Sequence, residues 1–322
     1  MVKIKLSIDV GYSCVKAISE NGRKVKMPSI IAPFRELPLY ELSKNGTGYV
    51  VEIRNVNSST SKYFVGDLAI REGRSAATFT MDRKKHLHQN HDILILTTAR
   101  LLCATNSNKI VVGLPVAYFR EQKDELVRHI ERLHGEVSVN GNNFERISFD
   151  EVKAYPQAAG ALLTVDNLPS KGTVLVLDVG QKTTDFVGAD VGRGIARPVS
   201  SLCDSIEIGV HDIFDAIAAE FRTKTGAPID LALVADIFRN GSVCFRGRDL
   251  DFTEFIKKAR KQTAQSIADR VFSSLGDRAD FIKQIYIAGG GAMAIPELLD
   301  LLPASEVIPD PRWANAKGFL KV

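Results

Sequence analysis

The feature that most constrains this chain is a short phrase of sequence that occurs twice. Residues 173–178 (Thr-Val-Leu-Val-Leu-Asp) predict a strand buried on both faces, and Gly180 follows where the chain must turn. Thr183 and Thr184 then open a second apolar run, which predicts the returning strand of a hairpin. An acid at a strand end, a glycine turn and small hydroxyls together predict a socket for a metal-bound phosphate. Backbone N–H groups can approach the anion there, and the carboxylate can hold the cation through water.

The same phrase stands near the N-terminus. A strand reaches Asp9, and Gly11, Ser13 and a second strand follow. Asp9 and Asp178 are 178 − 9 = 169 residues apart, which leaves room for one domain between the two copies. The simplest interpretation is a duplicated α/β fold in two domains. Its halves would face each other across a cleft, with the phosphates of a nucleotide between the two hairpins.

Composition narrows the class of protein. A length of 322 residues and 45% hydrophobic residues predict a globular chain of two domains. The 42 basic and 38 acidic residues give a net charge of +4, which is too mild to indicate direct nucleic-acid binding. The four cysteines show no Cys-x-x-Cys spacing and predict reduced thiols. With no signal peptide and no apolar run near the ~20 residues that span a membrane, we expect a cytoplasmic protein without membrane contact.

Between the two phrases, Asn140-Gly141 predicts a hairpin turn, because both positions tolerate positive φ. Pro156 and Gln157 then predict the start of an Ala-rich helix. A glutamine there has two interpretations. It is an ordinary helix N-terminus, or its amide orients a water, since it can donate and accept without carrying charge near a phosphate.

The second half contains further signals. A third strand at 194–203 and a helix at 210–221 follow the second hairpin, and 226–252 predicts a helical and turn insertion. A long helix is predicted from Thr253 to about Leu275. The strand 284–288 then ends in three glycines, which let a backbone pass close to a flat ring or a phosphate.

Residues 81–91 carry positive charge and the histidines at positions 86, 88 and 91. A solvated loop is the expected structure. A partner contact and a metal site are the alternatives, although no cysteine or carboxylate stands at ligand spacing.

Taken in order, these landmarks resemble the phosphate-1 and phosphate-2 motifs of the actin, sugar-kinase and heat-shock-chaperone ATPase superfamily. Within it, the chain is similar to the bacterial actin-like ParM/StbA family of plasmid-segregation ATPases. The resemblance covers essentially the whole chain: Val-Gly-x-x-Ala at 65–69, Gly-Leu-Pro at 113–115, the adenosine motif at 289–291, and connect-2 at 313–318.

The resemblance implies an actin-like, ribonuclease H-like fold. Domain I would span 1–155, with a smaller subdomain inserted at about 20–90. Domain II would span 156–322 and would include the phosphate-2 hairpin, the adenosine motif and connect-2, where small residues let two helices cross closely.

It also implies roles for individual residues. Gln157 and Asp178 would be catalytic, with Gln157 positioning the attacking water. Asp9 and Asp178 would hold Mg²⁺ largely through water, and Lys16 would neutralise phosphate charge. Nucleotide contacts are implied for Asp9, Gly11, Tyr12, Ser13, Cys14, Lys16, Gly180, Gln181, Lys182, Thr183, Gly209, Glu220, Gly289, Gly290 and Gly291.

One position departs from the family pattern. Relatives usually have small residues where this chain has Gln181 and Lys182. Either these side chains point away from the nucleotide, or Lys182 contacts phosphate.

The expected function is that of a magnesium-dependent ATPase, using ATP or GTP, that polymerises into filaments of its own copies. A DNA-binding adaptor bound to a centromere-like plasmid site would connect the filament to DNA. Two alternatives stay open. A sugar or amino-sugar kinase of the same superfamily would need a second carboxylate as base, and the first half offers no clear candidate. The other is a non-filament module of the pilus or cell-division type.

Overall fold

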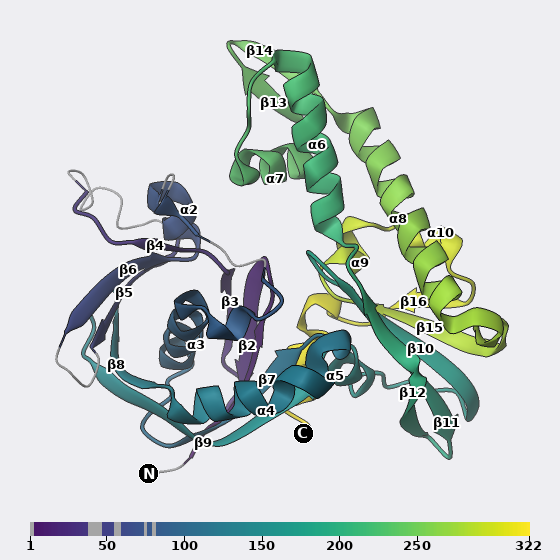
Figure 1. Ribbon diagram of the computed structural model, residues 1–322, viewed down its shortest axis with the longest axis horizontal. Helices are drawn as coiled ribbons and strands as arrows, with labels where there is room; N and C mark the ends of the chain where they lie inside the picture. The colour runs from purple at the N-terminus through teal and green to yellow at the C-terminus, as the bar shows by residue number, and fades with distance from the viewer. Residues whose placement is uncertain (1–2, 38–46, 55–58, 74–75, 79–81) are drawn as a thin grey trace. The chain divides into compact units, whose positions relative to one another are not determined.

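The computed structural model describes residues 3–37, 47–54, 59–73, 76–78 and 82–322 (Figure 1). The chain forms two compact units. The first contains Met1–Thr164 together with Asn315–Val322, and the second contains Val165–Ala314. The expected boundary at 155/156 falls within the first unit, to which the C-terminal residues 315–322 also belong.

Hydrogen bonds from the first strand explain this return. Ser7 Oγ donates to the carbonyl of Ala316 at 2.6 Å, and Lys5 Nζ donates to the carbonyl of Leu320 at 2.8 Å. Phe319 is fully buried. A Cβ on Gly318 would overlap the carbonyl of Gly160, so this crossing of α5 (Ala159–Leu162) and α11 (Ala314–Phe319) requires glycine.

The first unit is built on one mixed sheet, in the order β3-β2-β1-β7-β9-β8-β5-β6-β4. β1 pairs antiparallel with β2 and parallel with β7, and β7 pairs parallel with β9. The central strands are almost wholly buried, as a sheet covered on both faces requires. The elements are β1 (Lys5–Val10), β2 (Cys14–Ser19), β3 (Lys24–Pro28), β4 (Ile31–Pro33), β5 (Tyr49–Arg54), β6 (Thr60–Val65), α2 (Asp67–Gly73), η2 (Lys85–Leu87), α3 (Gln89–Leu101), β7 (Asn108–Leu114), α4 (Val116–Arg132), β8 (His134–Val139), β9 (Glu145–Pro156), α5 (Ala159–Leu162) and α11 (Ala314–Phe319).

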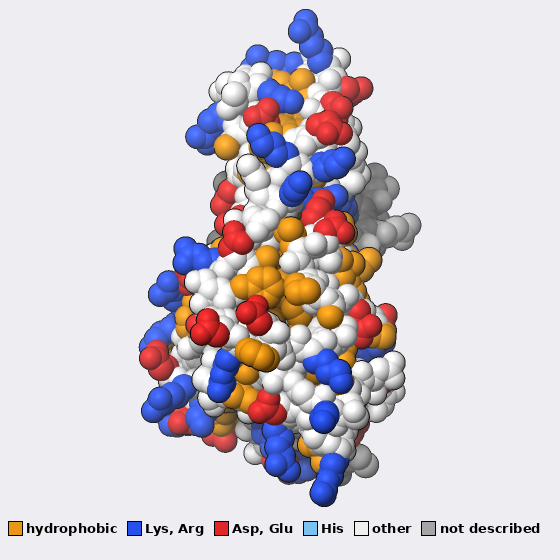
Figure 2. Space-filling model, turned by 90° about the vertical axis from the view of Figure 1, so that its right-hand side faces the viewer, with side chains coloured by type: hydrophobic (Ala, Val, Ile, Leu, Met, Phe, Trp, Pro, Cys, Tyr) orange, Lys and Arg blue, Asp and Glu red, His pale blue; other side chains and the backbone are white. Residues whose placement is uncertain are grey.

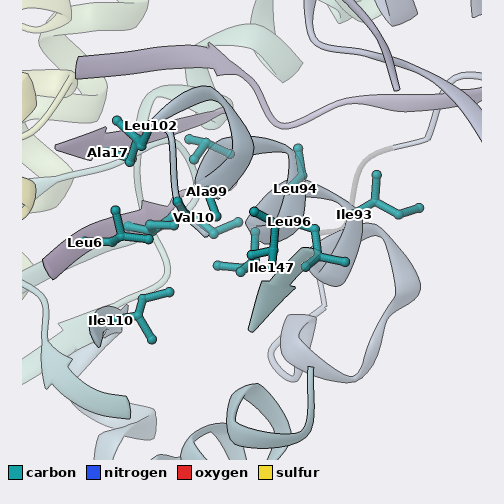
Figure 3. Close-up of a cluster of buried hydrophobic side chains, with 14 of the residues drawn as sticks. Leu6, Val10, Ala17, Ile93, Leu94, Leu96, Ala99, Leu102, Ile110 and Ile147 are labelled. Atoms are coloured by element: carbon teal, nitrogen blue, oxygen red, sulfur yellow. The ribbon is translucent and has the colours of Figure 1, made fainter. Parts of the chain in front are cut away.

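The core of the first unit forms around α3, which lies inside the curve of this sheet (Figure 1). Its side chains, among them Leu96 and Ala99, lie with those of Leu6, Ile110 and Ile147 from the surrounding strands (Figure 3). Each of these residues is at least 97% buried. A helix enclosed in this way has to be apolar nearly all round.

The second unit has the sheet order β12-β11-β10-β15-β16. β10 pairs antiparallel with β11 and parallel with β15, and helices α6 and α8 pack together beside the sheet (Figure 1). The elements are β10 (Lys171–Val179), β11 (Thr184–Gly192), β12 (Ile195–Ile206), α6 (Val210–Thr225), α7 (Leu231–Asn240), β13 (Ser242–Phe245), β14 (Arg248–Asp251), α8 (Thr253–Leu275), η3 (Gly276–Phe281), β15 (Ile282–Ala288), α9 (Gly291–Ala294), α10 (Leu298–Leu301), β16 (Ser305–Val307) and η4 (Pro311–Trp313).

The two units repeat one arrangement of strands. The order β3-β2-β1-β7-β9 of the first sheet matches β12-β11-β10-β15-β16 of the second. In each, a central strand has its hairpin partner on one side and a parallel strand on the other. The duplication inferred from the repeated phrase is therefore present in the fold.

Most predicted elements are found, with two local differences. Asn140 and Gly141 have φ of 53° and 75° and connect β8 to β9, and α8 has the predicted bounds. The insertion at 226–252 contains a β-hairpin (β13–β14) beside its helix. Pro156 does not open a helix but is the last residue of β9, and α5 begins only at Ala159.

Candidate functional site

The first candidate turn connects β1 to β2. Asp9 is 4% exposed, and β1 continues one residue past it, to Val10. The Gly11 N–H donates to the Cys14 carbonyl at 3.1 Å and closes the turn. A Cβ on Gly11 would lie 2.9 Å from that carbonyl oxygen, so the close approach requires glycine.

Ser29 holds this turn from the neighbouring strand region. Its hydroxyl donates to the Gly11 carbonyl at 2.7 Å, and its N–H donates to the Ser13 carbonyl at 2.9 Å. Peptide groups are planar and trans, so a carbonyl directed at Ser29 turns the following N–H, that of Tyr12, to the opposite side. This arrangement suits an anion, because backbone donors can then point outward.

Two side chains approach the Asp9 carboxylate. Lys16 Nζ lies 4.0 Å from Oδ2, and Gln157 Nε2 donates to Oδ1 at 2.8 Å. Gln157 is 8% exposed, and its N–H donates to the Leu114 carbonyl at 2.8 Å, at the end of β7. The first unit thus brings Asp9, Lys16 and Gln157 together from three different segments.

Hydrogen bonds to the Asn315 side chain hold the backbone that follows Gln157. Ala158 has φ of 59°, and its N–H donates to Asn315 Oδ1 at 3.1 Å. The N–H of Ala161 donates to the same oxygen at 3.2 Å. Asn315, in the connect-2 segment, therefore supports the bend that places Gln157.

The second candidate turn connects β10 to β11 and repeats the first. The Gly180 N–H donates to the Thr183 carbonyl at 2.8 Å, and a Cβ on Gly180 would lie 2.8 Å from that oxygen. Asp178 is 8% exposed, and β10 also continues one residue past its acid. Gln181 and Lys182, which occupy the turn, are partly buried.

Helix α6 begins against this second turn. The N–H groups of Val210 and His211 donate to the carbonyls of Gly180 (3.2 Å) and Gln181 (2.8 Å). A Cβ on Gly209 would lie 2.6 Å from the Gln181 carbonyl oxygen. Glu220 lies farther along the same helix, about 15 Å from its start at 1.5 Å per residue, so the structure does not bring it to the turn.

The three glycines after β15 have different surroundings. Gly289 has φ of 84°, and a Cβ there would overlap Val179 and the Asp178 carboxylate. A Cβ on Gly291 would overlap the Val179 side chain, whereas one on Gly290 would meet open space. Two of the glycines are thus needed for packing against the end of β10, and Gly290 faces outward.

The stretch with three histidines is only partly solvated. Asp82, Arg83, Lys84, Leu87, His88 and Gln89 are exposed, whereas Lys85, His86 and His91 are 5%, 0% and 5% exposed. The expectation of a solvated loop therefore holds for part of the stretch only, since the stretch includes η2 and the first turn of α3. Burial lowers the pKa of His86 and lowers that of His91 well below its usual value, with neighbouring Lys85 adding to the effect on His91. Met81 lies outside the described residues. No group of three or more metal-ligating side chains occurs in the part of the chain that the structure describes.

Sequence reasoning missed two residues beside the turns. Asp185 is 2% exposed and lies opposite Asp178 in the pairing of β10 and β11. It accepts hydrogen bonds from Thr183 (3.3 Å) and from Ser205. Lys85, the second, donates to the Val10 carbonyl. The carboxylate two positions after Thr183 was a signal in the sequence, but nothing in the pattern around Lys85 indicates its contact.

Comparison with known families identifies the class. The model of the actin-like protein N-terminal domain matches residues 7–160, and that of the C-terminal region of the archaeal MreB-like actin homologue matches residues 176–300. These two matches, with the duplicated sheets and turns, show that the chain belongs to the actin-like proteins.

Individual relatives narrow the class. The chain is 25% identical to an archaeal actin homolog of Thermoplasma volcanium over 340 residues, covering 98% of this chain and 97% of that protein. Its fold matches a subunit of a 15-stranded ParM filament from Clostridium botulinum with a TM-score of 0.90 and 25% identity, over 100% and 99% of the two chains. An archaeal actin homolog in complex with ADP matches with a TM-score of 0.78 and 21% identity, over 99% and 98%. Within the actin-like proteins, this chain is thus similar both to archaeal actin homologs and to ParM.

Proposed function

We propose that this chain binds the magnesium complex of ATP or GTP, hydrolyses it, and uses the nucleotide state to control its assembly into filaments. The observation that carries the proposal is the repeated turn, which closes with the same hydrogen bond in both units. Each turn has a nearly buried aspartate at the end of a central strand. The ADP complex of an archaeal relative and the ParM filament from Clostridium botulinum support nucleotide binding and assembly.

The hydrogen bond from Gln157 to Asp9 suggests how the glutamine acts. A carboxylate only accepts, so the amide nitrogen of Gln157 must face Asp9. Its oxygen Oε1 is then the group left to accept a hydrogen bond from a water. In our proposal this oxygen orients the attacking water in line with the terminal phosphate, and Asp178 stabilises the same water.

The carboxylates suit magnesium. Mg²⁺ is usually bound through one or two carboxylates, phosphate oxygens and several retained waters. In our proposal Asp9 and Asp178 would supply one carboxylate each, and Lys16, 4.0 Å from Asp9, would add positive charge for the phosphates. Bound there, the ion would neutralise charge that develops on the phosphates.

The finer role follows from the ParM likeness. We propose that the filament moves plasmid DNA through an adaptor protein, with no direct contact between this chain and DNA. On the face shown in Figure 2, lysine and arginine side chains are interspersed with acidic ones, and hydrophobic side chains gather near its middle. Hydrophobic surface of this kind is typical of protein contacts. No helix among the described residues is both long and apolar enough to cross a membrane.

A binding experiment tests whether one nucleotide uses both turns. Gly11→Ala and Gly180→Ala each place a Cβ within 2.9 Å of a backbone oxygen, one in each unit. Both should weaken the affinity for ATP at least about tenfold, since a displaced turn loses backbone donors worth about 1.4 kcal/mol or more. Gly192→Ala, with nothing within 4 Å of its Cβ, is the control. If only one of the two turn variants binds more weakly, a nucleotide shared by both turns is excluded.

A second experiment tests hydrolysis and assembly. Asp178→Asn should slow phosphate release about 100-fold or more and leave much of the ATP binding intact. Asp190→Asn, at the far end of the same hairpin, is the matched control. With ATP and Mg²⁺, the unaltered chain should form polymer that sediments and disassembles as phosphate is released. Unchanged turnover in Asp178→Asn, or a chain that never sediments with ATP, would contradict the proposal.

A further inference from the structure

Lys85 makes a contact that the family motifs do not account for. It precedes α3 in the sequence, is 5% exposed, and donates from its ammonium to the carbonyl of Val10. Val10 lies between Asp9 and Gly11, so Lys85 reaches the start of the first turn from a segment 75 residues away.

The same segment contacts the turn at a second point. The Lys85 ammonium lies 4.8 Å from the ring centroid of Tyr12, within range of a cation–π interaction. The Tyr12 hydroxyl donates to the carbonyl of Asp82 at 3.4 Å. Residues 82–85 therefore contact the turn at Val10 and at Tyr12, on either side of Gly11.

Packing alone does not support the turn. A small pocket borders it, lined by Gly11, Tyr12, Ser29, Lys85 and His91 among others. Where side chains do not fill the space, the position of the turn depends on its polar contacts. Among these contacts are the hydrogen bonds from Ser29 and Lys85 to the turn and the one from Tyr12 to Asp82.

We propose that Lys85 is a positioning residue for nucleotide binding, which fixes the Val10–Ser13 turn and adds positive potential behind it. This rests on the proposed nucleotide site. A hydrogen bond from a charged donor is stronger than a neutral one, and a buried cation is poorly screened by salt. A triphosphate, with its greater negative charge, should depend on Lys85 more than a diphosphate does.

The test compares Lys85→Met with Lys84→Met. Lys84 is the neighbouring residue, its side chain is 56% exposed, and its ammonium lies 3.5 Å from Glu125. Affinity for ATP and for ADP is measured by calorimetry, after thermal melting confirms that each variant is folded. We expect Lys85→Met to bind ATP about tenfold more weakly and ADP with a smaller loss, and Lys84→Met to match the unaltered chain. Lys85→Arg, which keeps the charge, should recover part of the ATP affinity.

The outcomes separate this inference from the proposed function. If the unaltered chain binds no nucleotide, the proposed function fails. If it binds ATP and folded Lys85→Met binds equally well, or loses ATP and ADP affinity to the same extent, the role of Lys85 is refuted. If Lys85→Met does not fold, the role of Lys85 is tested by amide hydrogen exchange of the unaltered chain with and without ATP. ATP should slow exchange across residues 82–91, and unchanged exchange there would overturn the inference.

Discussion

Gly209 offers a sharp test of how the second turn is built. Its φ of −163° is open to any residue, so Gly209→Ala introduces a steric change without backbone strain. The new Cβ would lie 2.6 Å from the Gln181 carbonyl oxygen and 2.8 Å from that of Gly180. Because real Cβ contacts stay above 3.0 Å, the turn and the helix must separate by at least 0.4 Å.

That separation has a calculable cost. The hydrogen bond from His211 to Gln181 would lengthen from 2.8 Å to about 3.2 Å, the upper end of the usual range. The bond from Val210 to Gly180, already 3.2 Å, would pass beyond that range. Losing one hydrogen bond costs about 1 kcal/mol, and overpacking costs about 1–3 kcal/mol. We expect a loss of about 2–4 kcal/mol in the free energy of unfolding of the second unit.

Urea denaturation followed by far-UV circular dichroism measures the loss. With a slope of about 2–3 kcal/mol per M, the midpoint should fall by about 1 M. ATP affinity should fall about tenfold or more as the turn moves. Gly192→Ala controls for the general effect of replacing glycine by alanine in this unit. A Gly209→Ala chain with an unchanged midpoint and unchanged ATP affinity would show that the contact between helix and turn is not as described.

Three further predictions concern other parts of the molecule. Gln157→Ala should slow hydrolysis about 100-fold and prolong any polymer in a sedimentation time course; a normal rate would remove Gln157 from the mechanism. Asn315→Ala leaves the buried N–H groups of Ala158 and Ala161 without their acceptor and should lower the free energy of unfolding by about 2–3 kcal/mol; a change under about 0.5 kcal/mol in chemical denaturation would contradict this. His91 has a depressed pKa in the folded chain, so its contribution to stability is complete above the unfolded pKa of about 6.5 and is lost as the pH falls from there towards the folded value. Between these two pKa values the free energy of unfolding of the unaltered chain should change by about 1.4 kcal/mol per pH unit because of His91, and His91→Gln should remove this dependence. Denaturation of both chains from pH 7.5 to 5.5 measures it. The same pH dependence in both chains would argue against a buried neutral His91.

Local sequence signals predicted the central strands and their turns well. A buried strand, an acid and a glycine depend on residues close in sequence, and so does the Asn140-Gly141 hairpin. These signals led to Asp9, Gly11, Asp178 and the duplicated fold. The sheet orders confirm the duplication, because β3-β2-β1-β7-β9 and β12-β11-β10-β15-β16 show the same arrangement of strands.

Contacts between distant segments could not be predicted in the same way. The helix expected from Pro156 begins only at Ala159, because β9 continues beside β7 up to Pro156. Lys85 and His91 are buried because α3 lies inside a curved sheet, a property that emerges only once β5, β6 and β8 are in place. A charged stretch rich in histidine is typical of a surface, and its sequence alone does not indicate otherwise.

The return of residues 315–322 to the first unit has a consequence for biosynthesis. The strand that carries Asp9 is made first, yet Ser7 and Lys5 on it find their partners only in the last residues of this sequence. The first unit, although its strands are made first, therefore cannot form these two contacts until all of the second unit has been synthesised.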